Sequence, residues 1–369
     1  MIYRKYGQTN KEVSIIGFGG MRFLDEDFKD GNYEKCAELV LYAREKGINY
    51  FDTAPLYCDD NSEKIMGYAF KQMKKDFFVS TKTSTHVTGD KTSDDVLRRI
   101  ETSLTRLGVD QINFMHLWCV LDYEMFKGYT QKGGIFEGFQ KAKERGLVEH
   151  ISLSTHASGE DIEKMLETGL FEGVLLGYNA TNFAFREKGL EAAKRLNRAV
   201  VTMNPLGGGL IPQSADYYSF LKQNDKDTVA KAAIRFNASH PEITVTLCGF
   251  STKDQVDEAC EAIKDLKPIT DDEKLNIKSH LKASLNNLCT GCGYCDDCPK
   301  DIAIPKLMDA YNQYIITDKK EDILGRIQNH WQLKEDKGDA AECIACGKCE
   351  KVCTQKLPII KRLAEIASL

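Results

Sequence analysis

An acid and a phenol stand five residues apart where an apolar, strand-like segment of the chain ends. Residues 49–54 have the composition of a short buried strand, and Pro55 stops it, so Asp52 and Tyr57 are predicted at its carboxyl end. A phenol can donate a proton to a carbonyl oxygen, but an unperturbed pKa of about 10 makes it a poor donor at neutral pH. The pair therefore indicates acid–base chemistry, provided that a cation lies nearby.

Such a cation, and a further proton-handling group, end the next two strand-like segments. Lys82 closes residues 77–82, and His116 lies near the end of residues 112–117. We expect Asp52 to keep Lys82 charged, Lys82 to lower the phenol pKa, and His116 to orient the carbonyl oxygen or relay the proton. A lone tyrosine after a strand is usually a packing residue. Four suitable residues at successive strand ends favour an active site.

These segments belong to a longer alternation of strand-like and helix-like stretches. A hairpin is predicted at residues 2–14, placed where it would plug the amino-terminal mouth of a barrel. The predicted strands are 14–20, 49–54, 77–82, 112–117, 150–155, 173–179, 199–205 and 243–249, each followed by a helical pattern. Eight such units predict an α/β fold, the closed parallel (β/α)8 TIM barrel. An open doubly wound sheet would normally carry a Gly-rich dinucleotide fingerprint, which Gly17-Phe18-Gly19-Gly20 does not match.

This part of the chain resembles the aldo-keto reductase family. The run Phe51-Asp52-Thr53-Ala54, followed by Tyr57, is similar to the FDTA-x-x-Y motif that opens the family's tetrad. The resemblance implies reduction of an aldehyde or ketone, with hydride from NAD(H) or NADP(H) and a proton from the tyrosine. It assigns the catalytic tetrad to Asp52, Tyr57, Lys82 and His116.

The same resemblance implies a nucleotide site along the strand ends. Leu206–Gly209 follows the seventh strand, where bare glycines would let backbone N–H groups approach a pyrophosphate, and Ser251 follows the eighth. The expected cofactor-binding residues are Gly19, Gly20, Met21, Ser154, Thr155, Met203, Leu206, Gly207, Gly208, Gly209, Ser251, Gln255 and Glu258.

Around the nicotinamide the chain departs from the family pattern. Thr155, Leu175 and Met203 stand where family members carry Asn, Gln and Tyr, so only Ser154 and Thr155 keep hydrogen-bonding capacity there. Gly249 and Gln255 replace the basic residues that grip a 2′-phosphate. We therefore expect NADH rather than NADPH, with a flavin phosphate as the alternative occupant. His156, beside Thr155, is either a further acid or a packed loop residue.

Eight of the thirteen cysteines gather after residue 288 in two runs. The second run has the C-x2-C-x2-C-x3-C spacing of a [4Fe–4S] site, whereas zinc would need only two C-x2-C pairs. The first run has two residues instead of three before its last cysteine, and Thr354 replaces the usual Pro after the second. In two-cluster ferredoxins the last cysteine of each run binds the other cluster. This rule predicts one site with Cys289, Cys292, Cys295 and Cys353, and another with Cys343, Cys346, Cys349 and Cys298.

The residues between and after the runs have helical periodicity, at 304–331 and 359–366. We therefore expect a barrel over residues 1–280 and, over 281–369, a domain that resembles an α-helical ferredoxin with two [4Fe–4S] clusters. The clusters would be auxiliary to carbonyl reduction, or would pass single electrons from a ferredoxin-like partner to a substrate or flavin in the barrel. They could also serve only as staples for a small helical domain. A third reading makes the barrel a mere docking platform for electron transfer.

The bulk composition narrows the remaining possibilities. A net charge of −5 gives no basic excess for nucleic-acid binding. No apolar run approaches the roughly 18 residues that suggest a membrane span, and Met1-Ile2-Tyr3-Arg4-Lys5 lacks the core of a signal peptide. Clustered cysteines in a chain of this size indicate a reducing compartment. We expect a cytoplasmic enzyme with a small carbonyl substrate.

Overall fold

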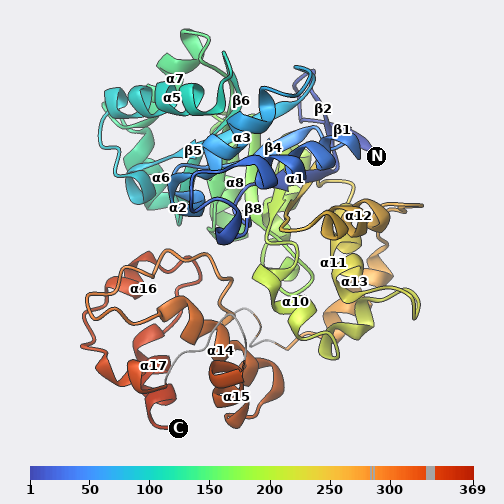
Figure 1. Cartoon of the computed structure of the whole chain (residues 1–369), viewed down its shortest axis with the longest axis vertical. Helices are drawn as coiled ribbons and strands as arrows, with labels where there is room; N and C mark the ends of the chain where they lie inside the picture. Colours follow the sequence, from blue (N-terminus) through green and yellow to red (C-terminus); the bar gives the residue numbers. More distant parts are fainter. Residues whose placement is uncertain (283–284, 286, 330–336) are drawn as a thin grey trace. The chain divides into compact units, whose positions relative to one another are not determined.

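The strand-like segments of the sequence form a closed barrel in the order β10-β3-β4-β5-β6-β7-β8-β9, with every neighbouring pair parallel (Figure 1). The computed structural model describes the chain except residues 283, 284, 286 and 330–336. The prediction of a (β/α)8 TIM barrel is confirmed. Its strands are β3 (Ile16–Gly19), β4 (Tyr50–Asp52), β5 (Phe78–Thr83), β6 (Ile112–Val120), β7 (Val148–Thr155), β8 (Gly173–Gly177), β9 (Ala199–Met203) and β10 (Val245–Gly249).

Helices cover the outside of the barrel between the strands (Figure 1). They are α1 (Glu34–Glu45), α3 (Ser62–Phe70), α5 (Ser93–Leu107), α6 (Tyr123–Thr130), α7 (Phe136–Glu144), α8 (Gly159–Glu167), α9 (Glu187–Arg195), α11 (Val229–Ala238) and α12 (Lys253–Ala262), with short turns at α2 (Tyr57–Asp60) and α4 (Thr85–Thr88). The sequence sets their ends. In α5, Thr92 and Asp95 form a reciprocal capping box, and Gly108 ends the helix at a φ of +64°.

A hairpin closes the amino-terminal mouth of the barrel, as the sequence predicted. Strands β1 (Tyr3–Lys5) and β2 (Glu12–Ser14) pair antiparallel. Tyr6, which follows β1, is fully buried; its ring lies 3.9 Å from the ring of Phe114, and its hydroxyl is 2.9 Å from the Oγ of Ser152. This plug leaves the carboxyl ends of the strands, at the opposite mouth, for the polar residues.

By its internal contacts the chain divides into two units. Unit 1 comprises Met1–Pro205 and Leu221–Lys274, and unit 2 comprises Leu206–Phe220 and Leu275–Leu369. The sequence predicted one boundary near residue 280, with Leu206–Phe220 left in the barrel. The structure differs because apolar side chains of this segment, Leu210 and Tyr217, pack with Leu288 in unit 2.

Unit 2 consists of helices and turns, and its described residues include no strand. Its elements are α10 (Leu210–Gln213), the end of α13 (Asp271–Ser279), α14 (Ile304–Thr317), α15 (Glu321–Asn329), α16 (Lys348–Val352) and α17 (Ile359–Ala367). The helical pattern predicted over 304–331 is found as α14 and α15, and Trp331 itself lies outside the described residues. Leu307, Met308 and Ile359 form the core together with Cys349 and Cys353. The prediction of a helical ferredoxin-like domain is confirmed.

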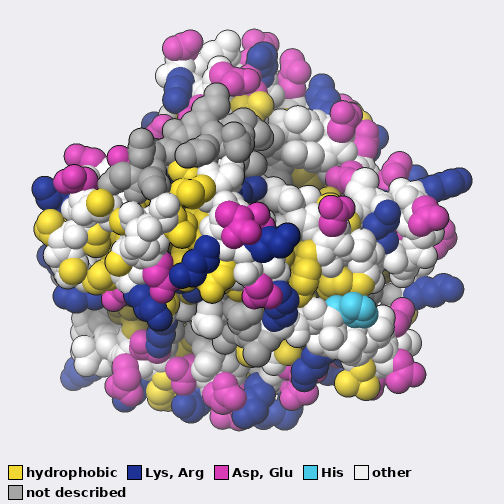
Figure 2. Space-filling view, turned by 90° about the horizontal axis from the view of Figure 1, so that it is seen from below, with side chains coloured by type: hydrophobic (Ala, Val, Ile, Leu, Met, Phe, Trp, Pro, Cys, Tyr) yellow, Lys and Arg dark blue, Asp and Glu magenta, His cyan; other side chains and the backbone are white. Residues whose placement is uncertain are grey.

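The surface carries mixed charges. Figure 2 shows basic and acidic side chains interspersed over one face of the molecule instead of gathered by sign. Among the helices of the described part, none is long and apolar enough to cross a membrane.

Candidate active site and cysteine pockets

Strand register brings three of the four predicted catalytic residues together inside the barrel. Lys82 on β5 is the register partner of His116 on β6, and Asp52 ends the neighbouring strand β4. Lys82 Nζ donates to the carboxylate of Asp52 and, at 3.0 Å, to the carbonyl of Thr53. Ser80 donates to the other carboxylate oxygen of Asp52 at 2.7 Å. Because all of these groups are buried, the lysine and the aspartate form a fixed pair.

Both nitrogens of the His116 ring are buried without a hydrogen-bond partner among the described residues. Nε2 lies 3.9 Å from a carboxylate oxygen of Asp52, which is too long for a hydrogen bond. Burial, and next the charge of Lys82, hold the pKa of His116 well below its usual value. A neutral imidazole with an unused N–H donor can orient a carbonyl oxygen.

Tyr57 lies on a strained turn at the edge of this group. Leu56, Cys58, Asp59 and Asp60 all have φ between +51° and +71°, the left-handed region that non-glycine residues rarely adopt. Such strain persists only where surrounding contacts enforce it. Two bonds of 2.7 Å from Arg106 to the carboxylate of Asp60 hold the turn to α5.

The surroundings of the Tyr57 phenol shift its pKa. Burial, and next the negative charge of Asp52, raise the pKa of Tyr57 well above its usual value. Lys82 Nζ lies over the ring face, 5.1 Å from its centroid, and donates to Asp52 and Thr53, so the lowering of the Tyr57 pKa by Lys82 stays a prediction. Tyr57 remains protonated at neutral pH.

The sequence did not identify Glu63 and Arg106 as part of this site. Glu63 on α3 is 1% exposed and accepts a 2.8 Å bond from Thr81 on β5, while Arg106 donates to it at 3.4 Å. Ser80 was also missed. Its place two residues before Lys82, on the same face of a strand, is a signal that could have found it. The helix residues carry no such signal, because only the fold brings them to β5.

The predicted nucleotide residues of the barrel lie at the carboxyl ends of their strands. Gly20 follows β3, and its N–H donates to the carbonyl of Asp52 at 2.8 Å. An added Cβ there would lie 2.6 Å from the Oγ of Ser62. Its neighbours Gly19 and Met21 end and follow the same strand, and Met21 is 37% exposed. The bare backbone at Gly20 is thus required by packing beside the tetrad.

Thr155 has less hydrogen-bonding capacity than its type suggests. Its hydroxyl donates to the carbonyl of Val120 at 2.7 Å and accepts from the N–H of Ala157 at 3.0 Å. The hydrogen that the sequence assigned to a nicotinamide carboxamide is therefore already used. Ser154, next to it, is buried, and Met203 ends β9 half-buried. Burial also lowers the pKa of His156 to about 3, so this histidine is a neutral packed residue and not an acid.

The remaining nucleotide residues fall into two places. Ser251, Gln255 and Glu258 lie around the start of α12, where the Ser251 N–H donates to the Gln255 side chain at 2.8 Å and the Thr228 hydroxyl donates to Glu258. Leu206, Gly207, Gly208 and Gly209 instead belong to unit 2. A Cβ on Gly208 would lie 2.4 Å from the carbonyl oxygen of Thr290. The absence of a side chain at Gly208 therefore allows the backbone of the first cysteine run to pack closely against it.

Unit 2 contains two pockets, each lined by four cysteines. Within the described ranges no three His, Cys, Asp or Glu side chains converge as a single-ion site would require. The first cysteine pocket is lined by Cys289, Cys292, Cys295 and Cys353. The second cysteine pocket is lined by Cys298, Cys343, Cys346 and Cys349. Each thus takes three cysteines from one run and one from the other.

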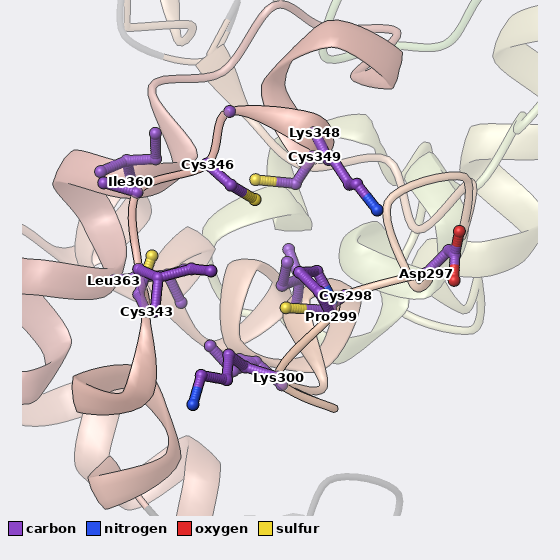
Figure 3. A pocket seen from close by; sticks show the side chains of 15 residues that line it. Asp297, Cys298, Pro299, Lys300, Cys343, Cys346, Lys348, Cys349, Ile360 and Leu363 are labelled. Atoms are coloured by element: carbon purple, nitrogen blue, oxygen red, sulfur yellow. The ribbon is translucent and has the colours of Figure 1, made fainter.

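The second cysteine pocket is open to the surface. In Figure 3, Cys346 and Cys349 turn their sulfurs toward one another, and Cys298 and Cys343 lie across the cavity. Cys346 is exposed, and its neighbour Ile344 is 58% exposed. The loop reaches this shape through positive φ values at Ala345 and Gly347.

None of the four cysteines of the first cysteine pocket is exposed. Asn312, fully buried on α14, holds the backbone of Cys289 by accepting from its N–H at 2.8 Å and donating to its carbonyl at 2.9 Å. The N–H of Leu357 points at the sulfur of Cys353 at 3.4 Å. Burial raises the pKa of the Cys289 thiol to about 12. Metal binding must therefore displace protons from these thiols.

The comparisons with known proteins find two families along the chain. Residues 15–282 match the sequence profile described as "Aldo/keto reductase family", which is more than half of the chain. The chain belongs to the aldo/keto reductase family. Residues 288–357 of this aldo/keto reductase match a second profile, "4Fe-4S dicluster domain". The protein is thus an oxidoreductase of that family with a ferredoxin-type domain.

Relatives of this aldo/keto reductase match it mainly over the barrel. The L-galactose dehydrogenase of Arabidopsis thaliana is 27% identical over 77% of this chain and 95% of its own length. The NADH-specific methylglyoxal reductase of Escherichia coli is 24% identical over 56% of this chain and 67% of its own. An aldo-keto reductase from Bacillus halodurans, in its holo form, superposes with a TM-score of 0.63 at 21% identity, covering 77% of this chain and 97% of its own. This last likeness shows the barrel fold.

Proposed function

We propose that this protein reduces an aldehyde or ketone, using hydride from NADH or NADPH and a proton from Tyr57. The observation that carries the proposal is the group formed by Asp52, Lys82 and His116, in which a buried ion pair lies beside a histidine. The ring nitrogens of this histidine meet no well-aligned hydrogen-bond partner among the described residues, although the backbone of Leu153 lies close to the ring. Buried polar atoms without partners are rare and mark places where a ligand atom belongs. A carbonyl oxygen would be an acceptor for the N–H of this imidazole ring.

Each residue has a defined task in this proposal. His116 donates to the carbonyl oxygen and orients it, which is possible because burial keeps its ring neutral. Tyr57, which is protonated at neutral pH, gives its proton to that oxygen as negative charge develops there. Lys82, fixed by Asp52, stabilises the tyrosinate that remains. The nicotinamide would supply the hydride to the carbonyl carbon.

We further propose that the two cysteine pockets hold two [4Fe–4S] clusters. The donor sets fit, since each pocket offers four thiols, three of them from one closely spaced run. Cys289, Cys292, Cys295 and Cys353 would bind one cluster, and Cys298, Cys343, Cys346 and Cys349 the other. Bound clusters would supply one-electron carriers and would also staple unit 2.

A second candidate function is favoured by two contacts. The Thr155 hydroxyl is unavailable to a carboxamide, and Leu206–Gly209 packs within unit 2 against the first cysteine run. Both weaken the case for an ordinary nicotinamide site. In this alternative, a ferredoxin-like partner delivers single electrons through the clusters to a substrate or a flavin in the barrel, and the same tyrosine supplies the proton.

The test is a panel of carbonyl compounds, such as glyceraldehyde, benzaldehyde and a methyl ketone, offered to the anaerobic holoprotein with NADH and then NADPH. The proposal expects alcohol to form, and expects Tyr57→Phe to lower turnover about 10²–10⁴-fold with the cluster absorption unchanged. Tyr68→Phe, on the exposed face of α3, is the matched control and should retain full turnover.

Three results would count against the proposal. Alcohol formation only with a reduced one-electron donor would favour the second candidate. Equal rates in the wild type and Tyr57→Phe would remove the tetrad from the reaction, and would leave the barrel as a docking platform. Iron and acid-labile sulfide in amounts below those of two cubes would contradict the cluster assignment.

A further inference from the structure

A buried arginine in unit 2 makes no direct ion pair with any described residue. Arg362 lies on α17 and is 4% exposed. Its Nη2 donates a 2.7 Å bond to the carbonyl of Asn287, but its Nη1, also buried, has no partner among the described residues. Glu365 on the same helix lies close enough to act on the guanidinium by its charge, but its carboxylate accepts the hydroxyl of Tyr311 and forms no direct ion pair with Arg362.

Two contacts place the guanidinium beside the first cysteine pocket. Asn287, whose carbonyl it binds, precedes Cys289 by two residues. The Cζ of Arg362 lies 4.7 Å from the ring centroid of Tyr311. The residue after Tyr311, Asn312, binds both the N–H and the carbonyl of Cys289. The helix that carries Arg362 begins at Ile359, which itself lines the pocket.

Such a charge is expensive to bury alone. Taking a guanidinium out of water without an ion-pair partner is costly, and an unpaired buried N–H adds to the cost. The described protein groups therefore compensate this positive charge only in part. A [4Fe–4S] core bound by four thiolates carries net negative charge, so it has the sign that this position lacks.

We propose that Arg362 is the fixed counter-charge of the cluster in the first cysteine pocket and raises the reduction potential of that cluster. The inference rests on the proposed function, since it requires a cluster in this pocket. Reduction adds one electron to the iron–sulfur core; no iron–thiolate bond breaks and no proton is taken up. A buried cation stabilises the added negative charge strongly, because little water screens it. Arg362 acts through its charge and touches no substrate.

The second cysteine pocket has cations of a different kind. Lys300 and Lys348 line it, but both side chains are exposed. Figure 3 shows both among the residues around the cavity, Lys348 at the start of α16. Water and salt screen charges in such positions. Arg362 therefore acts on one cluster of the two, which gives the experiment an internal reference.

The experiment is a redox titration of the full-length holoprotein, followed by electron paramagnetic resonance, for the wild type, Arg362→Gln, Arg362→Lys and Lys361→Gln. We expect Arg362→Gln to shift one cluster to more negative potential and leave the other unchanged. Arg362→Lys, which keeps the charge, should restore most of the shift. Lys361→Gln removes a neighbouring charge from the exposed side of the same helix and should change neither potential.

The iron and sulfide content of each variant shows whether a cluster has been lost or only its potential has changed. If Arg362→Gln loses one cluster while Arg362→Lys keeps both, the positive charge is required and the proposal stands. If Arg362→Lys loses the cluster as well, the side chain serves packing and the proposal falls. Unchanged potentials in Arg362→Gln overturn the proposal and leave the cluster assignment intact, whereas wild type without iron overturns the cluster assignment itself.

Discussion

The barrel site and the cysteine pockets are built in opposite ways. In the barrel, Asp52, Lys82 and His116 stand on adjacent strands, and protein groups already bind the carboxylate and the ammonium. In unit 2 the cysteines lie on loops with positive φ, such as Gly291 and Gly347, and face one another across cavities. In the barrel, protein groups hold the aspartate and the lysine in place. In the first cysteine pocket, burial raises the pKa of the thiols of Cys289, Cys295 and Cys353.

The largest expected effect is the loss of stability in unit 2 when iron is removed. Chelation of the clusters should lower the free energy of unfolding of unit 2 by more than about 5 kcal/mol, because metal binding in small cysteine domains contributes that much or more to folding. The barrel should keep its own thermal transition. Circular dichroism during heating, before and after chelation under anaerobic conditions, measures both. A barrel that melts together with unit 2 would show that the two regions are one folding unit.

Gly208→Ala tests the close contact inside unit 2. The substitution places a side chain at a φ of +71° and a Cβ 2.4 Å from the carbonyl oxygen of Thr290, so we expect a loss of about 2–4 kcal/mol. Gly31→Ala is the control, since its φ of +73° is similar but an added Cβ meets no atom within 4 Å. Urea unfolding and iron content provide the measurement. Equal losses at the two positions would refute the contact.

Arg106→Ala tests how the barrel holds Tyr57. The change frees Asp60 and leaves buried Glu63 without its cation, so we expect about a tenfold lower turnover and about 1–3 kcal/mol lower stability. Arg98→Ala removes only an exposed ion pair with Asp95 on the same helix, so this variant should keep both its turnover and its stability. Steady-state kinetics measure the turnover, and thermal melts measure the stability. A destabilised but fully active variant would mean that the left-handed turn holds Tyr57 without Arg106.

The smallest expected effect is the pH dependence of the barrel reaction. Because the pKa of His116 is held well below its usual value, the ring is neutral on both sides of pH 6.5, and the rate should change little between pH 5.5 and 8. Burial also lowers the pKa of Lys82. As the pH rises, Lys82 should therefore lose its charge at a lower pH than an ordinary lysine, and the rate should fall with it. A pH–rate profile measures this. A step near pH 6.5 that His116→Gln abolishes would contradict the neutral ring.

The sequence was most informative where local pattern and topology coincide. Alternating strand and helix patterns predicted the barrel, and its strand ends then placed Asp52, Lys82 and His116 on one rim, because parallel strands share an edge. Cysteine spacing likewise predicted a ferredoxin-type domain. These signals depend on periodicity, which a single sequence displays.

Other features depended on contacts that no local pattern displays. Three glycines after β9 have the composition of a phosphate loop, yet Gly208 packs on Thr290, because apolar Leu210 places the segment in unit 2. The left-handed turn at Leu56 starts with Leu56 and Cys58, two types that rarely adopt such φ values, and only Asp59 and Asp60 favour them, so the local composition did not predict the turn. Arg362 gave no signal on an otherwise amphipathic helix.

The most direct test of the central claim follows the hydrogen itself. The holoprotein is given NADH or NADPH deuterated at C4, with an aldehyde that the panel has identified, while the cluster absorption is recorded anaerobically. The account predicts deuterium on the carbinol carbon of the product and no bleaching of the clusters. Solvent hydrogen at that carbon, with bleaching in step with turnover, would contradict it and would assign the reaction to single electrons passing through unit 2.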